Sequence, residues 1–309
     1  MTLPITGVFC AAATPLDADL TPDSGMLVEH CHRLLAAGCD GIALLGTTGE
    51  ANSFSVDERK AILEAMVEGG IAPDKLLPGT GVAAIPETVA LTRHALSLGV
   101  STVVMLPPYY YKGVGDDGLF AAYARIIESI SDPRLRVILY HIPQMSGVPL
   151  THDLIARLIT AFPRTVVGIK DSAGDIANML AMVARFPQFS VLSGSDPLLL
   201  PLLRAGGAGS ITAAANVISR ELAAVFADAM DATKAVDLEP VQARIAAIRA
   251  LSTTYAQIPS VKDMIAAQSG ESGWRRVRPP LMPLSQAEHD DVRAKLARLD
   301  RTPAPVAAG

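Results

Sequence analysis

The chain has 309 residues, of which half are hydrophobic, and its formal net charge is −5. This length and apolar content exclude a disordered chain and suffice for one large domain with a substantial core. A negative chain without a basic stripe argues against nucleic acid as a partner, and no apolar run approaches the roughly 18 residues of a membrane span. The first ten residues lack the basic and apolar regions of a signal peptide, so we expect a cytoplasmic protein.

Cysteine usage agrees with that location. Cys10, Cys31 and Cys39 form no CxxC pattern, which predicts reduced thiols in a reducing compartment. His30 and His32 flank Cys31, but adjacent residues of a helix point to different faces and do not easily converge on one ion. We interpret this triplet mainly as core and surface packing, with a metal site as the less favoured alternative, and we predict no metal.

Eight short β-rich runs follow one another along the first two-thirds of the chain. They cover residues 7–16, 38–46, 76–82, 101–108, 136–143, 165–172, 189–196 and 207–215. They are apolar throughout rather than alternating, which indicates strands buried on both faces, as in a parallel sheet with helical crossovers. Helix-start signals lie between the runs: Ser55 and Glu58 form a capping box, and Pro22 and Pro86 suit a first helical turn.

Eight strand–helix units predict an α/β fold, the (β/α)8 TIM barrel, which typically needs ~250 residues. A doubly wound open sheet is the alternative. It would leave two strands over, however, and no GxGxxG pattern follows the first strand. We therefore assign residues 1–225 to a barrel that carries the active site.

The remaining residues, 226–309, are predicted to form a small helical extension that packs on the barrel. Strand signals stop there, and helical stretches are predicted near 221–254, 258–269 and 285–299. Ser285 and Glu288 form a capping box for the last of these, and the proline-rich segment 276–285 connects to it. Residues 302–309 are predicted to be mobile.

Lys170 is the most informative single residue. A barrel of this type places its active site at the carboxyl ends of its strands. Lys170 closes the apolar run TVVGIK, whereas the other six lysines fall in helices or exposed loops. An amine in an apolar barrel mouth loses solvation of its charged form, which frees it as a nucleophile towards ketones. The alternative is a buried lysine paired with an acid, either Asp171 or Asp175.

Hydroxyl groups end two other predicted strands. Tyr140 closes the strand before that of Lys170, where a phenol can relay protons during imine formation; a core tyrosine is the alternative. Thr47 and Thr48 lie in a GTTGE turn and could hold a carboxylate, together with backbone amides that Gly46 makes accessible. An ordinary turn is the alternative, and a phosphate cradle is less favoured because no Walker-type lysine follows.

A long aromatic segment, PPYYYKGVGDDG at residues 107–118, contains three consecutive tyrosines. A lid, an aromatic platform and a subunit interface are all compatible with it, and we favour the interface. His141 and His152 have no carboxylate or serine at a telling spacing, so we predict structural roles for both.

Several motifs together resemble the dihydrodipicolinate synthase and N-acetylneuraminate lyase family of class I, Schiff-base aldolases, over nearly the whole chain. They are GTTGE (46–50), PPYYY (107–111), YHIPQMSGV (140–148), GIKDS (168–172), LSGSD (192–196) and GSITAAANV (209–217). The resemblance implies that Lys170 forms an imine with pyruvate and that Tyr140 shuttles protons. It also implies that Thr47 and Tyr110 complete the relay, with Tyr110 donated across a tight dimer interface.

The same resemblance has consequences for partners and cofactors. It implies that Thr48 binds the pyruvate carboxylate and that the protein is a homo-oligomer, usually a dimer of dimers. No metal or organic cofactor is expected, since the imine itself is the electron sink.

Met145 departs from the dihydrodipicolinate synthase pattern. That pattern carries an arginine two positions after the proline of YxxP, which grips the carboxylate of aspartate semialdehyde, and here this position is Met145. An apolar thioether cannot replace a bidentate guanidinium. The segment YHIPQMSGV is more similar to the sialic-acid lyase and 2-keto-3-deoxy sugar acid members of the family.

We therefore predict a pyruvate-dependent lyase or aldolase for a 2-keto-3-deoxy sugar acid or a sialic-acid-type substrate, or a related dehydratase. Ser172 and Asp196 are suited to hydrogen-bond sugar hydroxyls. The predicted substrate-binding residues are Gly46, Thr48, Met145, Ser172, Gly194, Asp196 and Ile211. The alternatives are 4-hydroxy-tetrahydrodipicolinate synthase, which condenses pyruvate with aspartate semialdehyde, and a non-catalytic relative that binds a keto acid. A metal-dependent class II aldolase is disfavoured, because no His/Asp/Glu cluster lies at the strand ends.

Overall fold

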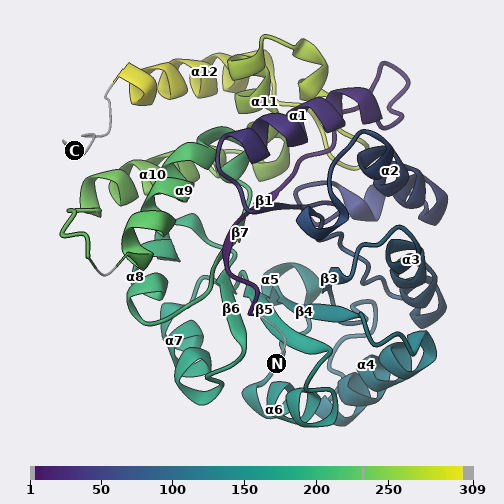
Figure 1. The fold of residues 1–309 in the computed structure, drawn as a ribbon. Coiled ribbons are helices and arrows are strands. Elements are labelled where there is room, and N and C mark those ends of the chain that lie inside the picture. Colours follow the sequence, from purple (N-terminus) through teal and green to yellow (C-terminus); the bar gives the residue numbers. More distant parts are fainter. Residues whose placement is uncertain (1–3, 232, 302–309) are drawn as a thin grey trace.

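Parallel strands form the centre of the protein. The computed structural model describes residues 4–231 and 233–301. Its strands are β1 (Gly7–Ala11), β2 (Gly41–Ala43), β3 (Thr102–Met105), β4 (Arg136–His141), β5 (Val166–Asp171), β6 (Ser190–Ser193) and β7 (Gly209–Thr212). They are hydrogen-bonded in the order β2-β1-β7-β6-β5-β4-β3, with every pair parallel, and Figure 1 shows helices around them. This arrangement confirms the predicted TIM barrel.

The segment 76–82 corrects one detail of the prediction, because it is not a regular strand. It occupies the place between β2 and β3, where single parallel bridges join Ile42 to Leu76 and Gly79 to Val104. Pro78 lies between these bridges and has no N–H to donate to a ladder, although its carbonyl accepts from the Val104 amide at 3.0 Å. The eighth position of the barrel is thus filled by an irregular chain that still closes the ring.

The helices that surround the barrel begin largely where local signals predict. They are α1 (Ser24–Ala36), α2 (Val56–Glu68), α3 (Ile85–Ser97), α4 (Asp116–Ile130), the short α5 (Pro143–Ser146), α6 (His152–Ala161), α7 (Ile176–Arg185), α8 (Leu199–Arg204) and α9 (Ala215–Met230). The capping box before α2 is confirmed, because the Glu58 amide donates to Ser55 Oγ and the Ser55 amide donates to the Glu58 carboxylate. Pro86 lies in the first turn of α3 as expected. Pro22 lies before α1 instead, and Asp23 caps that helix by accepting from the Met26 amide at 2.9 Å.

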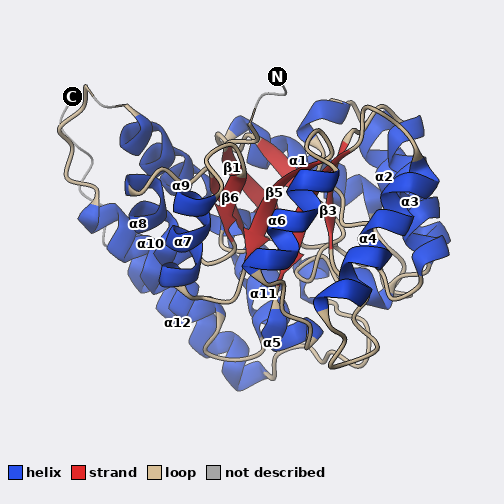
Figure 2. Cartoon of the chain, turned by 90° about the horizontal axis from the view of Figure 1, so that it is seen from below, coloured by secondary structure: helices blue, strands red, loops and turns tan. Residues whose placement is uncertain are grey.

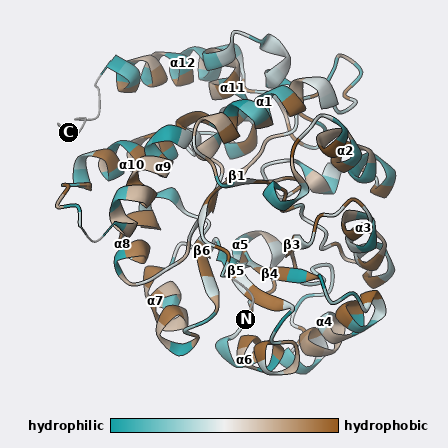
Figure 3. Ribbon diagram, in the orientation of Figure 1, coloured by the Kyte–Doolittle hydropathy of each residue, from teal (hydrophilic) through white to brown (hydrophobic). Residues whose placement is uncertain are grey.

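Apolar side chains pack on both faces of the strands. The inner face forms one cluster that includes Phe9, Ile138, Leu192 and Ile211. The outer face packs against the helices in a second and larger cluster. Figure 3 shows hydrophobic residues along the strands and mixed polarity along the helices around them. This double burial explains why the strand sequences are apolar throughout rather than alternating.

Three more helices follow the barrel, and their bounds correct the prediction. They are α10 (Glu239–Ser252), α11 (Gln257–Ser269) and α12 (Gln286–Arg301). The single stretch predicted for 221–254 is in fact the end of α9 and all of α10. Asp231 adopts extended backbone angles after α9, and Pro240 starts a new helix in the first turn of α10. The capping box before α12 is confirmed, with the Ser285 amide 2.8 Å from Glu288 Oε2. The tail predicted to be mobile, 302–309, lies outside the described residues.

Trp274 connects the C-terminal helices to the barrel. Its side chain is fully buried and packs with Val261 and Ile265 of α11 and with Ala13 and Ala213, which follow the carboxyl ends of β1 and β7. Figure 2 shows α11 at the same end of the barrel as α5. The C-terminal helices therefore cover part of the barrel end at which the active site is predicted.

The cysteines and the two histidines beside Cys31 pack against or hydrogen-bond to other parts of the chain. Cys10, Cys31 and Cys39 are buried free thiols. His30 is buried, and its Nε2 lies 3.1 Å from Asn216 Oδ1. His32 is exposed, and its ring contacts a different partner, the Gly69 carbonyl. Within residues 4–231 and 233–301, no group of three potential His, Cys, Asp or Glu ligands is placed to hold a metal, and no helix is long and apolar enough to cross a membrane.

Trp274 also gives a test of whether the predicted C-terminal region and the barrel unfold together. It is the chain's only tryptophan, so its fluorescence reports on their contact. We expect the unfolding curves from fluorescence and from far-ultraviolet circular dichroism to coincide. Trp274→Ala should lower the free energy of unfolding by about 3–5 kcal/mol, because it leaves a large cavity. Met282→Ala, at an exposed side chain, is the control. A fluorescence transition that clearly precedes the dichroism transition would contradict this coupling.

Candidate active site

A mostly apolar cavity opens at the carboxyl ends of the strands. The side chains there that can do chemistry are Thr47, Asn52, Tyr140 and Lys170, and most of the other lining residues are aliphatic or glycine. Three of these four were predicted from the sequence, and Gly46 borders the same cavity. A Cβ atom on Gly46 would meet no atom within 4 Å, so a ligand group can approach this backbone.

Lys170 lies on β5 directly beside Tyr140 on β4, because the two residues are partners in the strand register. The Lys170 side chain is nearly buried, and its Nζ lies 4.3 Å from the centre of the Tyr140 ring. Among the described residues, no carboxylate lies within ion-pair distance of it. Asp171 accepts instead from Ala173 and Asn178, and Asp175 caps α7. The alternative of a lysine paired with Asp171 or Asp175 is therefore wrong.

The Tyr140 hydroxyl is held by polar neighbours. It shares a hydrogen bond with the Thr47 hydroxyl, with 3.3 Å between the two oxygens. Burial raises the pKa of Tyr140, but the positive charge of Lys170 opposes this effect. Hydrogen bonds with Thr47, Lys170 and Ser172 add to that opposition, so the pKa lies below the usual value for tyrosine. A phenol in this state exchanges its proton more readily than an ordinary tyrosine.

Gly194 makes room for Ser172 beside Tyr140. A Cβ atom on residue 194 would lie 1.9 Å from Ser172 Oγ, so only glycine fits there. The Gly194 amide also donates to the Asp171 carbonyl at 2.6 Å, which ties the turn after β6 to the end of β5. Gly194 thus acts through Ser172, and neither residue lines the cavity directly.

The GTTGE turn is bounded by two residues in the left-handed conformation, Leu45 and Glu50, each with φ of 55°. Non-glycine residues adopt this conformation only where the surroundings hold them. Gly49 lies so close to β1 that a Cβ would be 2.9 Å from the Ala12 carbonyl, and its own carbonyl accepts from Thr14. This packing orients the Thr47 hydroxyl towards Tyr140. Thr48, in the same turn, is half-buried, and its role in carboxylate binding stays a prediction.

Tyr110 does not reach the site within one chain. Its side chain is 74% exposed, and its ring packs edge-to-face on Tyr111, which is 73% exposed. Tyr109 is the tyrosine of this segment that points inward, and it donates to Asn52 Oδ1 at 3.0 Å. Lys112 ties the loop to α5 by donating to the Ser146 carbonyl at 2.5 Å.

Asp196 and Ile211 do not line the cavity. The Asp196 side chain is completely buried, and its backbone carbonyl accepts from Gln242 of α10 at 3.0 Å. Burial raises the pKa of Asp196, which favours its neutral form. The prediction that Asp196 binds substrate hydroxyls is not supported by this position, because the carboxyl is completely buried and does not line the cavity. Ile211 packs inside the barrel near Tyr140.

Met145 is exposed to solvent, whereas the rings of His141 and His152 form hydrogen bonds within the fold. Met145 is 64% exposed on α5 and does not line the cavity. The His141 ring is buried and its Nδ1 accepts from the Leu150 amide at 3.1 Å, while burial lowers its pKa and favours the neutral ring. His152 Nε2 lies 2.9 Å from Asn178 Oδ1. Both rings are thus held by contacts within the fold, and their purely structural roles stay a prediction.

Sequence reasoning missed four residues that shape the site. Asn52 lines the cavity, and Gln144 anchors α5 by donating to the Ser172 carbonyl at 2.6 Å. Glu50 and Lys262 form a buried ion pair behind the GTTGE turn. Glu50 could have been found, since it belongs to the motif, but Lys262 carries no local signal that separates it from a surface lysine on a helix.

The comparisons with known proteins agree with this geometry. The sequence model of the dihydrodipicolinate synthetase family matches residues 4–299. The chain belongs to this family. An uncharacterized DapA-like lyase of Chloroflexus aurantiacus is 34% identical over 296 residues, covering 95% of this chain and 96% of the relative. As a member of the dihydrodipicolinate synthetase family, the protein is a lyase.

Two solved structures of the family have the same fold. Dihydrodipicolinate synthase from Agrobacterium tumefaciens str. C58 matches with a TM-score of 0.88 and 32% identity, covering 95% of this chain and 99% of that one. YagE, a prophage protein of the family from E. coli K12 in complex with pyruvate, matches with a TM-score of 0.86 and 26% identity, covering 96% and 98%.

The lowered pKa of Tyr140 gives a test of the contact with Lys170. Replacing Lys170→Met removes the opposing charge, so burial should dominate and move the pKa of Tyr140 above that in the wild-type protein. The measurement is an ultraviolet difference titration, with Tyr140→Phe in each background to isolate this phenol from the other five tyrosines. An unchanged titration midpoint would show that the Lys170 charge does not act on Tyr140.

Proposed function

We propose that this protein is a Schiff-base-forming lyase or aldolase that cleaves a 2-keto-3-deoxy sugar acid or sialic-acid-type substrate into pyruvate and an aldehyde, or condenses the two. The observation that carries the proposal is the pairing of Lys170 and Tyr140 at the mouth of an apolar cavity. A nucleophilic amine and a proton donor are what imine chemistry requires, and no carboxylate competes for the amine within the described structure.

In the proposed reaction the Lys170 amine, in its neutral form, adds to the ketone carbon of pyruvate. Tyr140 and Thr47 carry a proton to the departing oxygen, which leaves as water, and an imine remains. Loss of a methyl proton then gives an enamine, whose carbon attacks an aldehyde, and hydrolysis releases the product and the free amine. Cleavage runs through the same steps in reverse. The imine is the electron sink, so the proposal invokes no metal or organic cofactor.

Pyruvate fits the GTTGE turn in this proposal. Its carboxylate would be held by the Thr48 hydroxyl and by amides of the turn, which Gly46 leaves open to a ligand. The complex of the similar YagE protein with pyruvate supports the choice of keto acid.

The polarity of the site favours an uncharged partner aldehyde. Lys170 is the only cationic side chain among the described residues that line the cavity, and Met145 stands where a guanidinium would grip a second carboxylate. 4-Hydroxy-tetrahydrodipicolinate synthase activity, which needs the acidic aspartate semialdehyde, is the alternative, and a non-catalytic keto-acid-binding protein is the second.

We further propose a homo-oligomer, a dimer of dimers located in the cytoplasm. The exposed Tyr110 and Tyr111 rings support a contact between copies, since large exposed aromatic groups are typical of interfaces. In such a dimer, Tyr110 of one subunit would complete the proton relay in the site of the other subunit. Within a single chain the relay lacks this tyrosine.

Borohydride trapping tests the imine. The protein is incubated with pyruvate, reduced, digested and mapped by mass spectrometry across all seven lysines. We expect a reduced pyruvyl adduct on Lys170 and none in Lys170→Ala, because only this amine lines the cavity. The folding of the variant is checked by circular dichroism. Absence of an adduct on folded wild-type protein would refute imine formation with pyruvate.

Met145→Arg tests the choice of partner aldehyde. An arginine there should improve kcat/KM for aspartate semialdehyde by at least about tenfold, as expected for one charge-assisted hydrogen bond to a carboxylate. Met145→Leu, which keeps the position apolar, is the matched control. Efficient use of aspartate semialdehyde by the wild-type enzyme, with sugar-acid substrates inert, would instead favour the synthase alternative.

A further inference from the structure

A fully buried ion pair joins the C-terminal helices to the GTTGE turn. Lys262 Nζ of α11 lies 2.6 Å from Glu50 Oε1, and both side chains are 0% exposed. The two residues are 212 positions apart in the sequence. Burial lowers the pKa of Lys262, and the neighbouring Glu50 carboxylate opposes that shift. Two charges without solvent depend on each other, so their relative position is tightly constrained.

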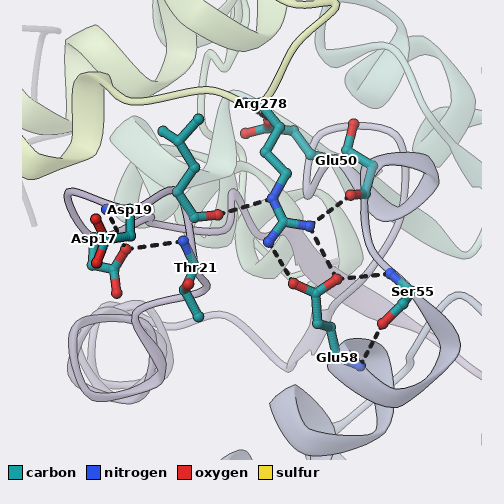
Figure 4. A network of polar contacts seen from close by, with 9 residues as sticks. Asp17, Asp19, Thr21, Glu50, Ser55, Glu58 and Arg278 are labelled. Carbon is teal, nitrogen blue, oxygen red and sulfur yellow. Dashed lines mark hydrogen bonds and ion pairs between the residues drawn. The ribbon is translucent and has the colours of Figure 1, made fainter.

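The second oxygen of Glu50 is held by the connector between α11 and α12. Its Oε2 accepts from the Arg278 amide at 2.9 Å. The Arg278 guanidinium in turn donates to the Leu20 carbonyl at 2.8 Å. It also pairs with the Glu58 carboxylate, as Figure 4 shows. Both carboxylate oxygens of Glu50 are thus bound by groups of the C-terminal region, and the connector is itself anchored to the loop after β1 and to α2.

Glu50 controls the geometry of the turn that it ends. Its φ of 55° is a left-handed conformation that a glutamate adopts only under external restraint. In this conformation its amide donates to the Thr47 carbonyl at 3.1 Å, and the next amide, of Ala51, donates to the Gly46 carbonyl at 3.2 Å. These bonds close the turn that places the Thr47 hydroxyl 3.3 Å from Tyr140.

We propose that Lys262 is a positioning residue of the active site. Through Glu50 it holds the turn of Thr47 and Thr48 in the conformation that receives the substrate carboxylate. The C-terminal helices then contribute to substrate binding as well as to stability. The choice of pyruvate as the ligand rests on the function proposed above, whereas the restraint on the turn does not.

Lys262→Met tests the proposal, because methionine keeps most of the volume and removes the charge. We expect the KM for pyruvate to rise about tenfold, with a smaller fall in kcat. We also expect faster hydrogen–deuterium exchange in the peptide that covers residues 46–51. The melting temperature should fall as well, since Glu50 is left buried without its partner.

Asp263→Asn is the matched control. Asp263 is the next residue of α11, is also buried, and pairs with His289 at 2.6 Å and Arg275 at 3.2 Å, away from the turn. This variant should lower the melting temperature while the KM for pyruvate and the exchange of residues 46–51 stay at wild-type values. If both variants raise KM in proportion to their loss of stability, Lys262 has only a structural role and the proposal fails.

The double variant Glu50→Gln/Lys262→Met separates stability from positioning. It removes both charges, so the melting temperature should recover relative to Lys262→Met alone. The raised KM and the fast exchange should remain, because the turn has lost its restraint. Recovery of KM together with stability would overturn the proposal, as would a wild-type KM and exchange in Lys262→Met.

The exchange measurement keeps this test distinct from the test of function. If wild-type protein forms no adduct with pyruvate, the proposed function fails, and exchange in residues 46–51 still decides whether Lys262 restrains the turn. If the adduct forms in the wild type and Lys262→Met changes neither trapping rate nor exchange, the function stands and the positioning role fails.

Discussion

Closure of a parallel barrel buries both faces of every strand, and this constraint determines where chemistry can occur. Apolar side chains fill the inside of the ring and the space beneath the helices, so polar groups with access to a ligand are confined to the strand ends. Lys170 and Tyr140 meet there because β4 and β5 pair in a register that places them side by side. The irregular segment 76–82 completes the ring and borders the same cavity.

The apolar surroundings shift the pKa values of two buried ionisable groups near the strand ends in opposite directions. Asp196 is buried with little compensation, so its pKa is raised and its neutral form is favoured. Tyr140 is buried beside a cation and several hydroxyls, and its pKa is lowered instead. Burial alone therefore does not decide reactivity. The reactivity of Tyr140 depends on Lys170, its neighbour on the adjacent strand. Together the two residues give the mouth of the barrel an amine and a proton donor.

The turn that faces this pair is assembled from distant parts of the chain. Gly49 packs on β1, while Glu50 is bound by Lys262 and by the Arg278 amide from the C-terminal region. Trp274 packs the same region against the ends of β1 and β7. A view of the molecule as a catalytic barrel with a separate helical appendage is therefore incomplete, because the appendage supplies contacts that shape the barrel's own turn.

Local sequence determined seven of the eight predicted strands and most helix starts, because continuous apolar runs and capping residues act over a few positions. It placed Tyr140 and Lys170 at the ends of consecutive strands. It also indicated Thr47, since hydroxyls that end an apolar run lie at a strand end. Tertiary structure alone decided that Asp196 is buried and that Lys262 lies in the interior. Each of these depends on which distant segments pack together, and side-chain burial and pairing are set by those contacts rather than by neighbouring residues.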